Sequence, residues 1–416
     1  MNYTWETMRK QEAWYNENMK KRYNYRAYPN LEQTQHLAQV FGHARWTYNQ
    51  YLSLAKQEYA TSKTYNIANL MRASTTLAKQ EHEWLKNVSS VPLQQSARYA
   101  ALAYSNFFKS VTGKRKGRKV GFPRFKTRYS RQSAEYTQAG FSVRTQENWG
   151  YLRLGRLDKE IRFKLSRALP SYPTSVTITR EPSGEYYVSF VVEITPNVTR
   201  PISERTAGID LGLTDFASIA YSDGEREKIA NPRHLREREA RLKKAQQSLS
   251  RKQKGSNNRE KARINVAREH AKVKRARLDF LNKLTTRLVR ENQAIAVETL
   301  SITGLARTHL GKSVLDAGWG TFLSQLETKT AEQVRTLVRA DRWDPTSQVC
   351  SVCGVLDGKK PLSVREWECS ACNTVLDRDY NASVNIIVAA GLVETLNARG
   401  ENVRRVLASV NSRNSR

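Results

Sequence analysis

Apolar positions recur along the chain with two different periods, and the change of period divides it into segments. Asn30 is a good helix N-cap with Gln33 three residues on. After it, apolar residues follow helical spacing at Leu37, Val40, Phe41, Ala44, Tyr48, Tyr51 and Ala55. Similar spacing continues over 67–83 and 93–111. We therefore expect residues 30 to about 112 to form a helical module.

Residues 138–196 follow the alternating period of β-strands. Two strands, 176–180 and 186–193, are predicted on either side of the turn residues Glu181–Gly184. Shorter strands are predicted at Tyr151, Arg153 and 161–165. The segment is predicted to be a β module, and 196–201, which begins and ends with proline, a linker.

The C-terminal half mixes both periods. A strand, a glycine-containing turn and a second strand are predicted over 207–221, a short apolar strand ends at Glu298, and an amphipathic helix is predicted over 318–340. Between the strands, residues 233–292 are very basic and helical, and Lys254–Asn258 is predicted to be the tip of a helical hairpin. Such a charge run marks either a solvated helix face or a surface for a phosphate backbone.

Charge changes this picture most. The 416 residues carry 70 Lys and Arg against 39 Asp and Glu, which gives a net charge of +31. So large a surplus repels itself in a compact fold unless a polyanion neutralises it, and phosphate backbones are the usual partner. The length allows two to four domains, and a hydrophobic fraction of 39% is typical of a folded protein. Nucleic acid is therefore the expected partner.

An anionic membrane is the other partner that attracts basic charge. The longest apolar runs, such as 186–192 and 386–393, are far too short to span a bilayer. The first 26 residues contain no apolar segment of the kind that secretory signals carry. We expect a cytoplasmic protein that does not bind membranes.

Residues 112–131 form a basic loop in which Phe122 and Phe125 lie among cations such as Arg124. Rings interleaved with Lys and Arg suit stacking on bases beside phosphate contacts. The alternative is a solvated basic loop anchored by two buried rings. The pattern alone is compatible with both.

The four cysteines form two pairs, Cys350 with Cys353 and Cys369 with Cys372, separated by fifteen residues. Each pair lets a tight turn point two thiolates at one ion, and two pairs complete a tetrahedral shell. Because no ligand position stays open, the site is predicted to be structural, and thiolates favour zinc. Two disulfides or unrelated thiols are the alternatives, which a reducing compartment and the spacing disfavour.

Three carboxylates lie at the ends of predicted elements. Asp210 lies in an apolar strand, Glu298 ends another, and Asp379 begins an apolar helix. Taken singly, each has an ordinary explanation, since Asp210 suits a turn and either Asp377 or Asp379 suits a helix N-cap. Taken together, they match the arrangement that holds two Mg²⁺ ions, which phosphodiester cleavage uses to activate water and to stabilise the leaving oxygen.

From about Tyr23 to Leu396 the chain closely resembles TnpB, the transposon-encoded family of RNA-guided DNA endonucleases related to type V CRISPR effectors. The resemblance is carried by the blocks Tyr28–Asn30, Arg45, Tyr48–Asn49, Pro92–Ser96, Phe107–Phe108, Val120–Phe125, Gly208–Gly212, Val297–Leu300, Ala317–Gly320, Ser347–Gln348 and Asp377–Asp379. The last four blocks, in this order, are highly specific. Two features depart from the family pattern: residues 1–21 extend beyond the usual start, and Ser383 stands where alanine is more typical.

The resemblance implies a multidomain α+β architecture. Its expected parts are an N-terminal extension (1–21), a β-barrel-like wedge domain (22–30 and 135–200) with an inserted helical recognition domain (31–134), and a RuvC-like nuclease domain of RNase H fold (201–346 and 377–416) with an inserted zinc ribbon (347–376).

The resemblance also implies a function. Asp210, Glu298 and Asp379 would hold the magnesium ions and cut both DNA strands, while a guide RNA supplies sequence recognition. Tyr65 and Gln94 lie in segments that resemble the surface that reads a short motif beside the target. A transposase of the same element is an expected functional partner.

Three other functions are open to a chain with these features. They are an RNA-guided DNA-binding protein that represses without cutting, a strand-joining transposase, and a compact type V CRISPR effector. The intact carboxylate set argues against the first, and the family resemblance argues against the second. The sequence does not separate a transposon role from a CRISPR role.

Overall fold

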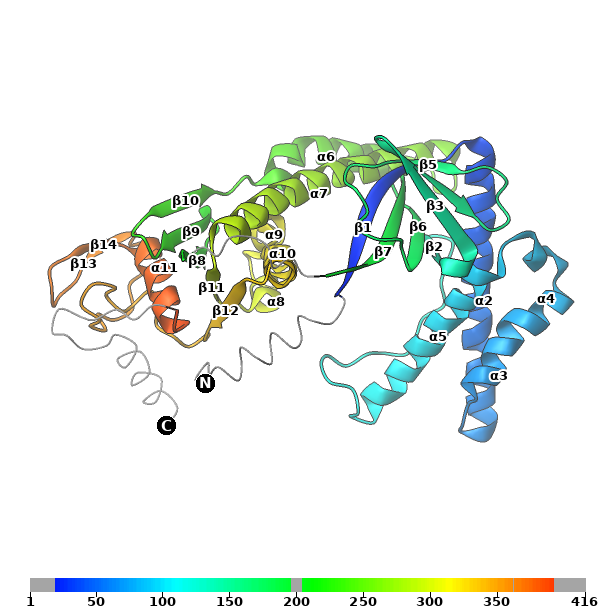
Figure 1. The fold of residues 1–416 in the computed structure, drawn as a ribbon, viewed down its shortest axis with the longest axis horizontal. Helices are drawn as coiled ribbons and strands as arrows, with labels where there is room; N and C mark the ends of the chain where they lie inside the picture. Colours follow the sequence, from blue (N-terminus) through cyan, green and yellow to red (C-terminus); the bar gives the residue numbers. More distant parts are fainter. Residues whose placement is uncertain (1–18, 196–203, 362, 393–416) are drawn as a thin grey trace. The chain divides into compact units, whose positions relative to one another are not determined.

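The computed structural model describes residues 19–195, 204–361 and 363–392 (Figure 1). Contacts divide them into two compact units, one containing 19–194 and the other 195 and the described residues after it. The predicted linker 196–201 and most of the predicted N-terminal extension lie outside these ranges. Residues 19–21, which were expected in the extension, belong to the first strand instead.

A curled, seven-stranded sheet forms the centre of the first unit (Figure 1). Its strand order is β2-β6-β7-β1-β5-β4-β3, and every neighbouring pair is antiparallel. The strands are β1 (Met19–Tyr28), β2 (Gln132–Thr137), β3 (Phe141–Gln146), β4 (Trp149–Leu154), β5 (Ile161–Lys164), β6 (Ser175–Arg180) and β7 (Tyr186–Ile194). The predicted hairpin around Gly184 is confirmed as β6 and β7, and Gly184 adopts the positive φ of 85° that its turn requires.

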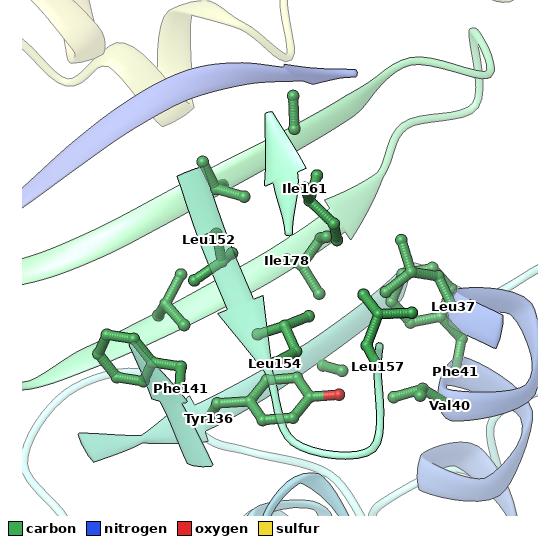
Figure 2. Packing of buried hydrophobic residues seen from close by; sticks show 14 of the residues in the cluster. Leu37, Val40, Phe41, Tyr136, Phe141, Leu152, Leu154, Leu157, Ile161 and Ile178 are labelled. Atoms are coloured by element: carbon green, nitrogen blue, oxygen red, sulfur yellow. The ribbon is translucent and has the colours of Figure 1, made fainter. Parts of the chain in front are cut away.

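One face of this sheet is the core of the unit. Figure 2 shows Leu152, Ile161 and Ile178 of the strands packed with Leu37 and Phe41 of a helix, all of them buried. Each such side chain contributes roughly 2 kcal/mol by leaving water. Because strand side chains alternate, the charged residues between these positions lie on the opposite, outer face.

The helical module is confirmed at its two long helices, α2 (Leu31–Ser62) and α5 (Ser90–Val111). Asn30 caps α2 and forms the predicted capping box with Gln33. The predicted helix over 67–83 is wrong in its continuity, since α3 (Ile67–Arg72) passes through a π-helical turn (Ala73–Leu77) into α4 (Ala78–Glu81) and a short 3₁₀ helix (Glu83–Asn87). At the break, the Ser74 and Thr75 hydroxyls donate to backbone carbonyls of the preceding turn, which bends helices.

A five-stranded mixed sheet forms the centre of the second unit, with the order β10-β9-β8-β11-β12. The strands β8 (Thr206–Leu211), β9 (Asp215–Tyr221) and β10 (Arg226–Ala230) are antiparallel neighbours. The strands β11 (Ala294–Glu298) and β12 (Thr336–Ala340) extend the sheet in parallel from β8.

Helices and a small hairpin complete this unit. The predicted basic helical hairpin is confirmed as α6 (His234–Ser250) and α7 (Asn257–Glu291), which lie side by side in Figure 1. The other elements are α8 (Ile302–Leu305), α9 (Gly311–Ala317), α10 (Trp319–Glu332), β13 (Glu366–Glu368), β14 (Val375–Asp377) and α11 (Arg378–Ala389). In the described ranges, no helix is both long and apolar enough to cross a membrane.

The helix predicted over 318–340 is too long. The helix α10 ends at Glu332, Val334 takes a positive φ of 51°, and residues 336–340 form strand β12 beside β11. A helical period continues through this segment, but Thr336 and Val338 are β-branched and the open edge of β11 offers them a full ladder of hydrogen bonds. Pairing with β11 therefore makes residues 336–340 a strand in spite of their helical period.

Candidate active site

Asp210 and Glu298 lie next to each other on parallel strands. Ile209 of β8 is in register with Val297 of β11, so the two acids are the next residue on each strand. Both acids are partly exposed, whereas Ile209, Leu211 and Val297 beside them are buried. The strands thus present two accessible carboxylates from an apolar base.

Helix α11 brings Asp379 to the same place because it packs closely on β8. A Cβ atom on Gly208 would lie only 2.1 Å from the carbonyl oxygen of Ser383 and 2.5 Å from Cγ1 of Ile387. Asp379 lies one turn before Ser383, and the Ser383 hydroxyl donates to the Asp379 carbonyl at 2.8 Å. The missing side chain at Gly208 therefore sets how near Asp379 comes to Asp210.

The N-cap of α11 is Asp377. Its Oδ1 accepts hydrogen bonds from the N–H groups of Asp379 and Tyr380, each at 3.0 Å, and its Oδ2 lies 2.6 Å from Nζ of Lys228. Burial alone would raise the pKa of Asp377, but the hydrogen bonds from Lys228 and the backbone outweigh it and lower that pKa. Because Asp377 serves as the cap, the Asp379 carboxylate is not needed to begin the helix.

The charges of the other two acids act on Asp210. Burial, followed by the charges of Glu298 and Asp379, raises the pKa of Asp210 to about 7, against the opposing effect of Arg378. Burial also raises the pKa of Glu298. A group of acids that resist ionisation together is stabilised by a cation placed among them. The donor set, oxygen only, is the one that Mg²⁺ prefers.

The carboxylates do not converge on a single point. Among the residues that the structure describes, only the four cysteines bring three or more metal-binding atoms within 4.8 Å of one another. Like charges without a cation between them repel one another. Asp379 forms an ion pair with Arg365 instead, in which Nη1 of Arg365 lies 3.4 Å from Oδ2 of Asp379. A site for two ions about 4 Å apart also has its ligands farther from one another than a site for a single ion, so carboxylates that do not meet at one point are compatible with it.

The cysteines form the predicted four-sulfur site. Sγ of Cys350 lies 3.8 Å from Sγ of Cys372, and Sγ of Cys353 lies 3.6 Å from Sγ of Cys369. A tetrahedron with zinc–sulfur bonds of about 2.3 Å has edges of about 3.8 Å. The cysteine geometry therefore fits zinc, and the thiols are free rather than joined in disulfides.

Two matching turns build this site. The carbonyls of Cys350 and Cys369 accept hydrogen bonds from the N–H groups of Gly354 and Asn373, both of which have positive φ. Trp367 is buried against the cysteines. The ribbon is tied to α11, because the Asn381 and Asn385 side chains both donate to the carbonyl of Val349, and because β14 runs directly into the helix.

The candidate nucleic-acid residues lie in the first unit, away from the carboxylates in the chain. Tyr65 packs edge-on against Tyr104 at 4.9 Å, and Gln94 is exposed on α5. In the basic loop, Phe122 packs edge-on against Tyr104 and Phe107 but is still 44% exposed. Arg124 and Phe125 are exposed. The alternative of a loop anchored by two buried rings is therefore wrong, since both rings are exposed, and stacking on bases stays a prediction.

Three residues of the site were not predicted. Gly208 had a usable signal, because a glycine inside a strand marks a close backbone approach. Lys228 and Arg365 had no signal in the sequence, since their partners are more than a hundred residues away or across the ribbon. Arg365 also donates to the Thr214 hydroxyl at 3.2 Å.

The mixed sheet, its three acids and the four-cysteine ribbon match the class of nucleases whose carboxylates act on phosphodiester bonds. Family models agree in chain order: a helix-turn-helix domain over 19–64, OrfB_IS605, described as "Probable transposase", over 189–309, and a Cas12f1-like TNB domain over 319–386. In the structure, 19–64 holds β1 and the single long helix α2.

Full-length relatives identify the family. A protein of Streptomyces pristinaespiralis, provisionally named an RNA-guided DNA endonuclease, is 41% identical over 394 residues, which are 93% of this chain and 92% of the relative. One from Escherichia coli K12 with the same provisional description is 27% identical over 88% and 91%. A TnpB-like protein of Acanthamoeba polyphaga mimivirus is 23% identical over 54% and 45%. This chain belongs to the TnpB family.

Solved structures share the fold. A Cas12f1 complex with guide RNA and target DNA has a TM-score of 0.57 at 15% identity, covering 86% of this chain and 83% of that one. The mini-RNA-guided endonuclease CRISPR-Cas_phi3 has a TM-score of 0.52 at 9% identity, covering 94% and 97%. At these identities the likeness concerns the fold alone.

Proposed function

We propose that this protein is an RNA-guided endonuclease that cuts double-stranded DNA complementary to its guide, beside a short adjacent motif. The observation that carries the proposal is that Asp210 lies at one edge of the mixed sheet close enough to Glu298 and Asp379 for the charges of both to raise its pKa. The names of the two bacterial relatives support the same activity.

The strand order supports a RuvC-like domain built on the second unit. Numbered along the chain, its five strands lie in the order 3-2-1-4-5, with the first three antiparallel and the last two parallel to the first. The curled sheet would be the wedge domain, and the helices between β1 and β2 the recognition domain, close to the expected boundaries 31–134.

The carboxylates fit magnesium by their donor atoms. Asp210, Glu298 and Asp379 would hold the ions, which when bound activate water and stabilise the leaving oxygen. Asp210 would give up its proton on binding, since its pKa of about 7 leaves it half protonated at neutral pH. The four cysteines would hold one structural zinc, and guide RNA, target DNA and a transposase of the same element would be the partners.

A cleavage assay with the full chain tests the proposal. The protein, purified with RNA expressed from its own locus, is given a matching duplex and Mg²⁺. Asp210→Asn should lower the cutting rate by about a hundredfold to a thousandfold, as loss of one preorganised electrostatic group does, while RNA and target binding persist. Asp279→Asn, an exposed acid on α7, should cut normally. An Asp210→Asn protein that still cuts, or a wild type without a discrete RNA, would refute the function.

The same assay separates the alternatives. A repressor would bind the target without cutting it, and a strand-joining transposase would give joined rather than linear product. The complete acid set and the relatives' names favour cutting. A transposon role is favoured over a CRISPR role by the OrfB_IS605 match.

A further inference from the structure

The turn that follows β12 begins beside the candidate active site. Ala340, the last residue of β12, is in register with Glu298 at the end of β11, and the Thr299 hydroxyl donates to the Ala340 carbonyl at 2.7 Å. Residues 341–346 continue from this point, and we call them the tryptophan turn because they contain Trp343. Ligands of sheets with parallel strands bind at the carboxyl ends of those strands, which is the edge where this turn begins.

The far end of the tryptophan turn is fastened to the helix that carries Asp379. The Thr346 carbonyl accepts hydrogen bonds from the side-chain amides of Asn381, at 3.4 Å, and of Asn385, at 2.7 Å. Both asparagines belong to α11, and Thr346 is buried. The turn therefore runs from the strand beside Glu298 to the helix of Asp379, so its two ends are fixed to neighbours of the candidate catalytic acids.

Short-range hydrogen bonds fix the middle of the tryptophan turn. Oδ1 of Asp341 accepts from the N–H of Trp343 at 2.9 Å, and Oδ2 of Asp344 accepts from the N–H of Asp341 at 3.0 Å. A carboxylate that binds a backbone N–H a few residues away stabilises a turn. The backbone at Trp343 is therefore held in place without the help of its indole ring.

The ring of Trp343 is left in water. It is 73% exposed, whereas Trp84, the next most exposed of the six tryptophans that the structure describes, is 38% exposed. A tryptophan is among the side chains that gain most from burial, so one on a fixed turn beside an active site is suited to cover a ligand. The turn carries two acids against one cation, Arg342, whose guanidinium lies 5.3 Å from the ring. Because this balance does not attract phosphate, the turn offers a ligand its ring rather than its charge.

We propose that Trp343 stacks on a base of the unpaired DNA strand next to the scissile phosphate and so positions that phosphate at the carboxylates. The inference rests on the proposed function, in which the guide pairs with one DNA strand and leaves the other unpaired. Trp343 lies three residues beyond Ala340, a span of at most about 11 Å, so its ring reaches a nucleotide that neighbours a phosphate held at Glu298. Stacking accepts every base, which suits a nuclease whose guide selects the sequence.

Removal of the ring and removal of its base should have the same effect. The full-length protein, loaded with guide RNA and Mg²⁺, is given duplexes in which the strand that does not pair with the guide is labelled and carries one abasic nucleotide, moved stepwise through the cut region. At one position the abasic nucleotide should slow cutting of this strand by the wild type about tenfold to a hundredfold, as loss of a stacked base does. Trp343→Ala should lose the same factor on the intact duplex, with no further loss at that position.

Conservative and matched variants separate stacking from a structural role. Trp343→Phe, which keeps a ring, should restore most of the cutting rate. Trp343→Ala should keep the guide RNA affinity and the unfolding temperature of the wild type, because the ring is exposed. Val375→Ala removes another apolar side chain of the same unit, which is 67% exposed, and should respond to the abasic nucleotide as the wild type does.

The outcomes distinguish this inference from the proposed function. Trp343→Ala that cuts the intact duplex as fast as the wild type would overturn the inference, while cutting by the wild type in the same assay leaves the proposed function standing. Losses from the variant and from the abasic nucleotide that multiply at every position would show that ring and base act independently, which overturns stacking. A lowered unfolding temperature or RNA affinity in Trp343→Ala would make the role of the ring structural and overturn it as well. A wild type that does not cut would overturn the proposed function and this inference with it.

Discussion

Under the proposed function, Asp210 would couple protonation to metal binding at a single residue. Its ordinary pKa of 3.8 is raised to about 7 by burial and by the charges of Glu298 and Asp379. Between about pH 4 and pH 7 the folded protein therefore holds a proton that the unfolded chain has lost. A raised acid pKa means that metal-free protein loses stability as pH rises through this window.

Asp210→Asn should remove this loss. Without divalent cations, the variant and the wild type should be similarly stable at pH 4, and at pH 8 the variant should be more stable by roughly 2 kcal/mol, a value reduced for partial exposure of the side chain. Adding Mg²⁺ at pH 8 should stabilise the wild type more than the variant. Urea unfolding at both pH values measures the difference in unfolding free energy between the variant and the wild type. The other titrating groups are the same in both proteins, so their contributions cancel. A difference that does not grow with pH would contradict the assigned cause.

Gly208 shows how a missing side chain can position a catalytic candidate. Gly208→Ala would place a methyl group 2.1 Å from a backbone oxygen of α11. Because backbone cannot swing aside, the helix must shift, at a cost of about 3 kcal/mol or more. We expect a lower urea midpoint and a cutting rate reduced at least tenfold.

A second glycine provides the control for that substitution. Gly320 in α10 has its nearest neighbouring atom 4.0 Å from the added methyl, so Gly320→Ala should be neutral or stabilising, as alanine favours helices. Equal effects of the two substitutions on the urea midpoint and the cutting rate would show that the close approach of α11 to β8 is not the cause of those effects.

At the scale of elements, the four-cysteine ribbon supports the helix that carries Asp379. The hairpin of β13 and β14 ends at Asp377, the cap of α11, and Asn381 and Asn385 bind back to the ribbon. Cys353→Ser should therefore lose its zinc and most of its cutting activity, while guide RNA binding is kept. Zinc content by elemental analysis, with cutting and RNA binding on the same sample, checks this. Full cutting by a zinc-free protein would contradict the link.

Elements with a strong local pattern were predictable, and those decided by distant pairing were not. The capped start of α2 and the hairpin around Gly184 are set by nearby residues. The strand 336–340 and the π-helical turn at 73–77 depend on a neighbouring strand and on hydroxyl bonds that periodicity does not show. The same holds at the site: the three acids could be named from the sequence, but their spacing depends on Gly208.

The whole molecule carries a net charge of +31, and much of it lies along exposed positions of α6 and α7, such as Lys243 and Lys244. Ions condensed on RNA are released when cations replace them, which makes affinity fall with salt. Neither helix contributes an acid to the candidate site, so we expect both to hold nucleic acid rather than to take part in the chemistry.

Salt dependence tests this expectation for the whole complex. Between 50 and 200 mM salt, RNA affinity should fall by about a thousandfold or more, as for proteins that bind six to ten phosphates. Lys243→Gln with Lys244→Gln should lower the slope by about 0.7 for each phosphate that is no longer neutralised, without changing the unfolding temperature, because both side chains are exposed. Once the complex is assembled at low salt, its cutting rate should respond less to added salt, since in the proposed function the acids and not the surface charge would do the chemistry. An unchanged slope would place the phosphate-binding cations on other parts of the chain.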